Sequence, residues 1–209
     1  MKTNKKIIFI DWNKTLSYSL FWGQLKEKDS LTYEKIEKWL FVDNRTVINP
    51  WMKGTIKSEQ IIKDMSNDID VSYTFLLEEF IISCKKMTWA FDGVETYIKK
   101  IRKKGMKVVI ATDNMDSFPE HTVPGMNISE LFDDYLVSST IGHLKDEEEA
   151  STIKFFDDYL KINNVTYHDV VLLDDSEDKH GKYKRNNFDR ILIDSPETLE
   201  QHLRRYAES

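Results

Sequence analysis

Residues 7–16 read IIFIDWNKTL, and the architecture of the chain can be worked out from them. An apolar run from Lys6 to Ile10 leads directly into Asp11, which opens the segment DWNKT. An uninterrupted run rich in Ile is typical of a strand buried on both faces of a parallel sheet. Open parallel sheets bind ligands outside the carboxyl ends of their strands, so Asp11 and the residues after it are candidates for a functional site.

Four further runs of strand length, rich in Ile and Val, follow along the chain at residues 107–111, 134–137, 169–173 and 190–193. Between them, apolar residues recur at helical spacing, as at Val94, Ile98 and Ile101. The last helix is predicted to begin with Ser195 as N-cap and Pro196 at its first position. Strands and helices therefore alternate over the second half of the chain, and the pattern predicts a doubly wound α/β sheet.

The segment between the first two strands is too long for a single crossover helix. It contains helical patterns at residues 33–40, 58–65 and 72–86, with Ser58 as the expected N-cap of the second. We therefore predict an inserted helical subdomain at residues 16–87, with the α/β core formed by residues 1–15 and 88–209. The expected hinges are residues 16–19 and 87–92.

The composition is that of an ordinary globular chain, with 209 residues, 40% hydrophobic and 32% charged. Its net charge of -6 gives no general attraction to nucleic acid, and the basic stretches at residues 99–107 and 182–185 are interpreted as solvated surface. The apolar run before Asp11 is too short for a signal peptide or a membrane span. Because Cys84 is the only cysteine, no internal disulfide can form, and we expect a cytoplasmic protein without a membrane partner.

Acidic and hydroxyl residues follow three of the predicted strands. The first strand leads into Asp11, the second into Thr112-Asp113-Asn114, and the fourth into Asp174-Asp175-Ser176. Each cluster alone could be a turn or a helix cap, but all three are expected at one edge of the sheet. Carboxylates that lie this close repel one another unless a cation sits among them, and oxygen ligands favour Mg²⁺.

The order of these motifs resembles that of the haloacid dehalogenase-like (HAD-like) superfamily. The first motif is the D-x-N-x-T-L that begins at Asp11, and the second is the strand ending in Thr112. The third is Lys145 after Gly-His-Leu, and the fourth is VVLLDDS at residues 170–176. The resemblance spans essentially the whole chain and implies a HAD-like, Rossmann-type parallel core. The helical insertion resembles the α-helical cap that one subgroup carries after its first motif.

The resemblance also implies a role for each matching residue. Asp11 would be a nucleophile that takes up a phosphoryl group, and Asp11, Asp175 and the backbone carbonyl of Asn13 would bind Mg²⁺. Asp174 would be a further ligand or would support one. Thr112, the adjacent backbone amide of Asp113, and Lys145 would hold the phosphate group, although Lys145 could instead be a surface charge.

The sequence departs from the family pattern at the second residue after the nucleophile. Family members that hydrolyse phosphate esters usually carry an acid there, whereas this chain has Asn13, which cannot exchange a proton near neutral pH. Lys14 also replaces a common Gly, and Asp146 replaces a frequent Pro after Lys145. The phosphate site is therefore expected to be present while turnover is weakened or altered.

Three functions follow from this pattern. The favoured one is an Mg²⁺-dependent phosphatase of small phosphorylated metabolites, suited to good leaving groups. The alternative is a catalytically impaired protein that binds phosphate or Mg²⁺ in a regulatory or interaction role. The third is a metal-independent dehalogenase, which the paired acids Asp174 and Asp175 disfavour because they would repel an anionic haloacid. Within the cap, Arg45, Trp51 and Lys53 are the candidates for substrate specificity.

Overall fold

The computed structural model describes residues 5–147 and 152–208, and its core is a five-stranded parallel sheet. The strand order is β3-β2-β1-β4-β5, so the chain winds outward in both directions from β1. The strands are β1 (Ile7–Ile10), β2 (Lys107–Thr112), β3 (Asp134–Val137), β4 (Val170–Asp174) and β5 (Asp189–Leu192). The predicted α/β fold is confirmed, and its topological switch point lies between β1 and β4, where such sheets bind ligands.

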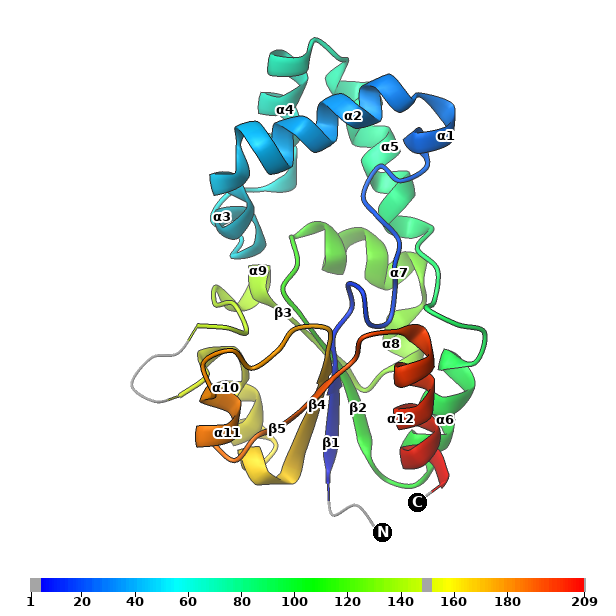
Figure 1. Cartoon of the computed structure of the whole chain (residues 1–209), viewed down its shortest axis with the longest axis vertical. Helices are drawn as coiled ribbons and strands as arrows, with labels where there is room; N and C mark the ends of the chain where they lie inside the picture. Colours follow the sequence, from blue (N-terminus) through cyan, green and yellow to red (C-terminus); the bar gives the residue numbers. More distant parts are fainter. Residues whose placement is uncertain (1–4, 148–151, 209) are drawn as a thin grey trace.

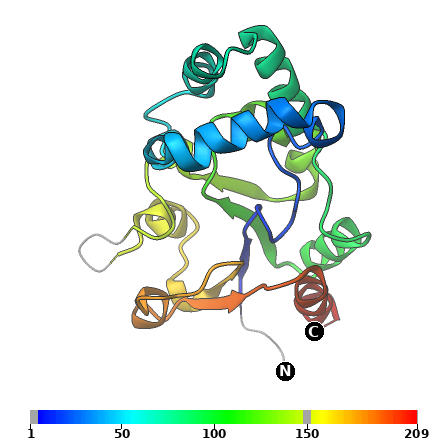
Figure 2. The same cartoon turned by 45° about the horizontal axis from the view of Figure 1, so that its top comes forward.

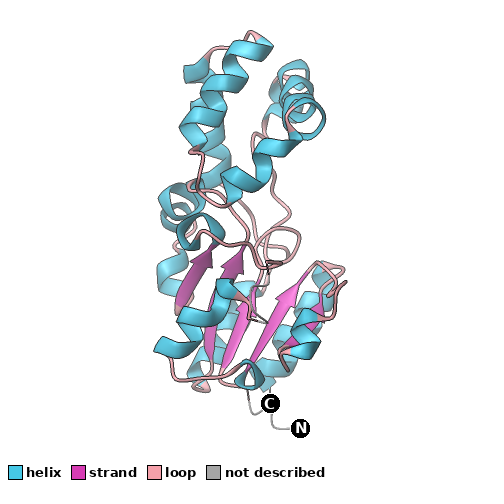
Figure 3. Cartoon of the chain, turned by 90° about the vertical axis from the view of Figure 1, so that its left-hand side faces the viewer, coloured by secondary structure: helices cyan, strands magenta, loops and turns pink. Residues whose placement is uncertain are grey.

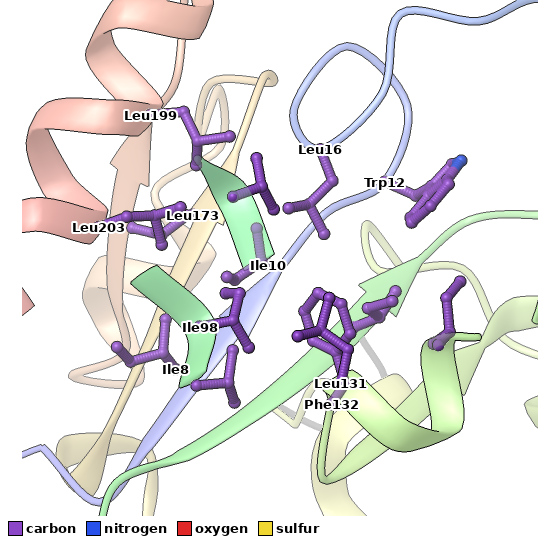
Figure 4. Packing of buried hydrophobic residues seen from close by; sticks show 14 of the residues in the cluster. Ile8, Ile10, Trp12, Leu16, Ile98, Leu131, Phe132, Leu173, Leu199 and Leu203 are labelled. Carbon is purple, nitrogen blue, oxygen red and sulfur yellow. The ribbon is translucent and has the colours of Figure 1, made fainter. Parts of the chain in front are cut away.

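Helices cover both faces of the sheet (Figures 1 and 2). Because side chains alternate along a strand, Ile8 and Ile10 point to one face of the sheet and Ile7 and Phe9 to the other. The first face packs against α6 (Val94–Lys103) and α12 (Pro196–Glu208), as Figure 4 shows for Ile98, Leu199 and Leu203. The second face packs against α10 (Lys154–Ile162) and α11 (Lys182–Arg185). The central strands β1, β2 and β4 are buried on both faces, apart from Lys107, which explains why they have no polar alternation.

A second group of helices lies over the carboxyl ends of the strands, toward which the strand arrows point in Figure 3. They share their own apolar cluster, which includes Trp22, Trp39 and Trp51. The helices are α1 (Leu25–Lys28), α2 (Ser30–Lys38), α3 (Ile48–Met52), α4 (Ser58–Ile69) and α5 (Tyr73–Lys85), with a π-helix η1 (Trp39–Asp43) and a 3₁₀ turn η2 (Arg45–Val47). We call this group the cap. It occupies the place of the predicted insertion.

The chain leaves and re-enters the core along two adjacent linkers. The backbone N–H of Ala90 donates to the carbonyl of Leu16 at 2.8 Å, and the backbone N–H of Thr88 donates to Ser19 Oγ at 2.9 Å. The predicted hinge segments are thus hydrogen-bonded to each other. The remaining short elements are η3 (Phe118–Thr122), α7 (Val123–Gly125), α8 (Ile128–Leu131), α9 (Ser138–Ile141) and η4 (Tyr167–Asp169).

One of the two expected serine caps is present, because Ser195 Oγ accepts from the backbone of Thr198. The structure adds a cap at Ser72, whose Oγ accepts from the backbone of Phe75. The prediction for Ser58 was wrong, because Ser58 is the first residue of α4 and its hydroxyl donates to the carboxylate of Asp116. The Asp116 carboxylate from the core thus caps this helix. A carboxylate is a stronger hydrogen-bond acceptor than a serine hydroxyl, and its negative charge complements the positive end of the helix.

No helix in the described part of the chain is long and apolar enough to cross a membrane.

Candidate active site

Asp11 lies at the carboxyl end of β1, in the middle of the sheet. Its backbone N–H continues the pairing with β4 by donating to the carbonyl of Leu173 at 2.9 Å, and its Oδ1 accepts from the backbone of Trp12 at 2.7 Å. The chain then turns sharply through Lys14, whose φ of 55° is left-handed. That conformation costs glycine the least, which agrees with the frequent Gly at this position in the family that the sequence resembles. The turn fixes the Asp11 carboxylate at the sheet edge.

Lys145 bridges two carboxylates at this edge. Its Nζ lies 2.9 Å from Asp11 Oδ1 and 2.6 Å from Asp174 Oδ2, and the residue is only 4% exposed. Its backbone N–H donates to Asp113 Oδ1 at 2.9 Å. Lys145 therefore belongs to the acidic cluster and is not a surface charge.

Burial and charge set the protonation of this cluster. Burial raises the pKa of the Asp11 carboxyl to about 7, helped by the nearby Asp174, against the opposing attraction of Lys145. Burial would also raise the pKa of Asp174, but the cations Lys145 and Arg190 lower it to about 2. Burial disfavours the charged form of Lys145, yet the surrounding carboxylates raise its pKa. A further cation beside Asp11 would therefore assist its ionisation.

The donor set fits a hard divalent cation. Asp11, Asp174 and Asp175 each offer a carboxylate oxygen, and these atoms lie within 4.8 Å of one another. Both oxygens of Asp174 already contact protein cations, Lys145 at 2.6 Å and Arg190 at 2.7 Å. Among the described residues, Asp175 is hydrogen-bonded only to the hydroxyl of Ser176. Asp11 and Asp175 are thus the side chains best placed to ligate Mg²⁺, with Asp174 orienting its neighbours.

The end of β2 and the segments that follow β1 and β2 contain buried polar groups that could bind an oxygen-rich ligand. Thr15 Oγ1, Thr112 Oγ1 and Asn114 Nδ2 are buried and have no hydrogen-bond partner in the described chain. Leaving such a group unpaired costs about 1–3 kcal/mol. Thr112 ends β2, the strand next to β1, so its hydroxyl lies at the edge where the resemblance places the phosphate group.

The family model described as haloacid dehalogenase-like hydrolase matches residues 28–181 of the chain. The chain is a haloacid dehalogenase-like hydrolase. The matched region covers most of the cap and three of the four motifs, and the first motif at Asp11 lies before it. A comparison with curated proteins gives no significant match.

Solved structures of HAD-like proteins share this fold. A predicted HAD-like family hydrolase from Porphyromonas gingivalis superposes with a TM-score of 0.72 at 14% identity, covering 98% of both chains. A HAD family enzyme from Bacteroides thetaiotaomicron, in complex with magnesium and inorganic phosphate, gives 0.64 at 12% identity, covering 91% of this chain and 95% of that one. The L-2-haloacid dehalogenase from Xanthobacter autotrophicus, with chloropropionic acid covalently bound, gives 0.61 at 10% identity, covering 96% and 83%. At these identities the likeness shows the fold alone.

The cap of this hydrolase is fastened to the core by polar contacts from two of its segments. The Oδ atoms of Asp116, a core residue, accept from the backbone of Ser58 at 3.2 Å, and Ser138 Oγ donates to the carbonyl of Met52 at 2.6 Å. Lys53 Nζ reaches Glu147 Oε1 at 2.8 Å, two residues beyond Lys145 in the chain. The cap is therefore closed over the sheet edge.

The structure separates the three residues proposed for specificity. Lys53 lies at the boundary between cap and core, where it forms an ion pair with Glu147 in the segment that carries Lys145. Trp51 is only 1% exposed, its indole donates to Ser58 Oγ at 3.0 Å, and it belongs to the apolar cluster of the cap. Arg45 borders a separate hollow on the cap together with Phe41. Among the described residues, Lys53 is the one of the three that has a hydrogen bond or ion pair to the core.

Sequence reasoning missed three residues that contact the site. The stretch at residues 182–185 was predicted to be solvated, but Lys182 is 4% and Tyr183 1% exposed. Lys182 is buried because its Nζ donates to the carbonyl of Lys145 at 2.7 Å and lies 3.0 Å from Asp146. Arg190 is the third residue, and its presence in an apolar strand was a signal that could have revealed it, since a buried charge needs a partner.

Proposed function

We propose that this HAD-like hydrolase is an Mg²⁺-dependent phosphatase of small phosphorylated metabolites, with Asp11 as its nucleophile and with turnover limited by Asn13. The observation that supports this most is the bridge from Lys145 to Asp11 and Asp174. It places a buried cation beside the proposed nucleophile, where a phosphoryl group would need charge neutralisation.

The reaction is proposed to take two steps. In the first, a carboxylate oxygen of Asp11 attacks phosphorus, and the bond from phosphorus to the leaving oxygen breaks, with the electron pair departing on that oxygen. In the second, water attacks phosphorus and loses a proton to a phosphate oxygen or to solvent, the aspartyl-phosphate bond breaks with its electron pair returning to the carboxylate, and inorganic phosphate is released. Lys145 would neutralise the phosphate oxygens, and Thr112 would donate its unpaired hydroxyl to one of them. A bound Mg²⁺ would add a Lewis acid at the phosphate oxygens.

Asn13 limits the choice of substrate. Its side-chain amide can donate a hydrogen bond to the leaving oxygen but cannot give it a proton, nor can it take one from water. General acid/base catalysis typically contributes about 10²- to 10⁴-fold, so esters with poor leaving groups should react slowly. Aryl phosphates and acyl phosphates leave as weak bases and are the substrates that this site would suit.

A regulatory or interaction role is the alternative, because Asn13 would also be found in a protein that binds phosphate without hydrolysing it. A dehalogenase is a weaker alternative. Asp174 is neutralised by Lys145 and Arg190, but Asp175 has no ion-pair partner among the described residues and would repel a haloacid.

One assay separates these functions. Release of nitrophenol from p-nitrophenyl phosphate is measured with Mg²⁺ and with a chelator, and chloride release from 2-chloropropionate is measured in parallel. The phosphatase proposal expects nitrophenol release that needs Mg²⁺ and is lost in Asp11→Asn. Binding of phosphate without turnover would favour the regulatory role, and chloride release without Mg²⁺ would favour the dehalogenase.

A further inference from the structure

The backbone of Lys145 is held by residues that come later in the chain. Its carbonyl oxygen accepts two hydrogen bonds from α11, one from Lys182 Nζ at 2.7 Å and one from Tyr183 Oη at 3.0 Å. Its N–H donates to Asp113 Oδ1 at 2.9 Å. Both polar groups of the Lys145 peptide backbone are thus bonded to side chains, which fixes where its long side chain starts.

Arg190 acts on the other end of the same side chain. Its Nη2 lies 2.7 Å from Asp174 Oδ1, while Lys145 Nζ lies 2.6 Å from Asp174 Oδ2. The guanidinium carbon lies 4.6 Å from the centre of the Tyr183 ring, and Nη1 lies 3.5 Å from Asp146. The Arg190 side chain is only 5% exposed, so its charge is directed at these carboxylates and not at solvent.

Arg190 affects how closely the Lys145 ammonium group pairs with Asp174 and with Asp11. Asp174 is fully buried, and without Arg190 its negative charge would be matched by Lys145 alone. Lys145 would then be drawn to Asp174 and away from Asp11, which lies 2.9 Å from the same nitrogen. With Arg190 present, Asp174 is satisfied on both oxygens, and Lys145 stays shared between Asp174 and the reaction centre.

We propose that Arg190 is a positioning residue which, together with Lys182 and Tyr183, holds Lys145 toward the phosphoryl group. Nothing in the four motifs assigns Arg190 a role. The proposal rests on the proposed function only in that it takes phosphate as the ligand of Lys145. Arginine suits this positioning role better than lysine, because its planar guanidinium can pair with Asp174 and Asp146 and at the same time stack on the ring of Tyr183.

The test measures the affinity of the full chain for inorganic phosphate by calorimetry at saturating Mg²⁺. Arg190→Met should weaken phosphate binding by about tenfold or more, and Arg190→Lys should recover part of the loss. Arg102→Met is the matched control, because Arg102 also pairs with a carboxylate, Asp133 at 3.0 Å, but lies in α6. That control should stay within about threefold of wild type.

A double-mutant cycle distinguishes positioning from general damage to the fold. If Arg190 acts through Lys145, then adding Arg190→Met to Lys145→Met should change phosphate affinity by less than about threefold. A full additional loss in that background would overturn the proposal, as would unchanged binding in Arg190→Met alone.

The outcomes also separate this inference from the proposed function. A wild-type protein that binds phosphate and shows the Arg190 dependence but hydrolyses no ester retains the inference and loses the phosphatase proposal. If wild type hydrolyses phosphate esters but Arg190→Met leaves phosphate affinity unchanged, the phosphatase proposal is retained and the inference about Arg190 is lost. If wild type binds no phosphate with Mg²⁺ present, both proposals fail.

Discussion

Replacing Asn13 by Asp tests whether the site is a phosphoryl-transfer centre that lacks only its acid. The two side chains are nearly isosteric, and the backbone of residue 13 keeps its pairing with Ser17. The new carboxyl would stand two residues after Asp11, whose carboxylate clusters with those of Asp174 and Asp175, and like charges nearby would raise its pKa toward the range of a useful general acid. We therefore expect a gain in turnover without a change in fold.

The size of the gain should depend on the leaving group. General acid/base catalysis contributes about 10²- to 10⁴-fold at best, so hydrolysis of an unactivated alkyl phosphate should rise by roughly 10- to 1,000-fold. A nitrophenyl ester needs little protonation of its leaving oxygen and should gain less in its first step. Steady-state rates on both esters at saturating Mg²⁺ give the comparison, with Asp11→Asn as the inactive reference.

The same substitution should also change stability in a way that Mg²⁺ reverses. An added carboxylate increases the repulsion in a cluster where Asp11 already has a pKa raised to about 7. Thermal unfolding should show a lower Tm than wild type without Mg²⁺ and a larger rise when Mg²⁺ is added. If Asn13→Asp folds, binds Mg²⁺ and still gains no activity on any ester, the phosphatase proposal is refuted and a binding role becomes the better account.

Three further predictions follow from the site and the cap. Mg²⁺ should raise the Tm of wild type saturably, with about 2.7 kcal/mol of stabilisation at a Mg²⁺ concentration a hundredfold above Kd. This rise should be smaller in Asp175→Ala. Equal rises in the two proteins would place the metal elsewhere. In metal-free protein, ionisation of Asp11 should lower the free energy of unfolding as pH rises from 3.8 to about 7, because the folded state binds the Asp11 proton more tightly than the unfolded chain does. Chemical denaturation should therefore show the free energy of unfolding falling more steeply with pH in wild type than in Asp11→Asn. Parallel slopes would contradict this. Asp116→Ala removes the hydrogen-bond acceptor at the start of α4, worth about 1 kcal/mol, and should loosen the attachment of the cap to the core, as measured by solution scattering. Asp29→Ala is the control, because Asp29 caps α2 within the cap itself and its loss should leave the attachment unchanged. Equal scattering curves for the two variants would show that Asp116 does not hold the cap to the core.

The strands and the acidic edge could be predicted because they depend on local pattern. The ends of each predicted strand lie within one residue of those observed, because short runs rich in Ile, Val and Leu favour strands. Asp11, Thr112 and Asp174 follow from those strands, because parallel strands bring their carboxyl ends to one edge. The roles proposed for these residues remain predictions that the experiments above address.

The partners of these residues could not be predicted, because they join positions far apart in the chain. Lys182 occurs in a basic stretch that has the pattern of a solvated surface, yet it is buried against a carbonyl 37 residues earlier. Ser58 is of a residue type that often caps helices, but its hydroxyl instead donates a hydrogen bond to Asp116, 58 residues later in the chain. Arg190 reaches Asp174 only because β4 and β5 pair side by side. Periodicity and strand ends are properties of neighbouring residues, whereas the sharing of charge around Lys145 depends on which side chains the packed sheet brings within reach of it.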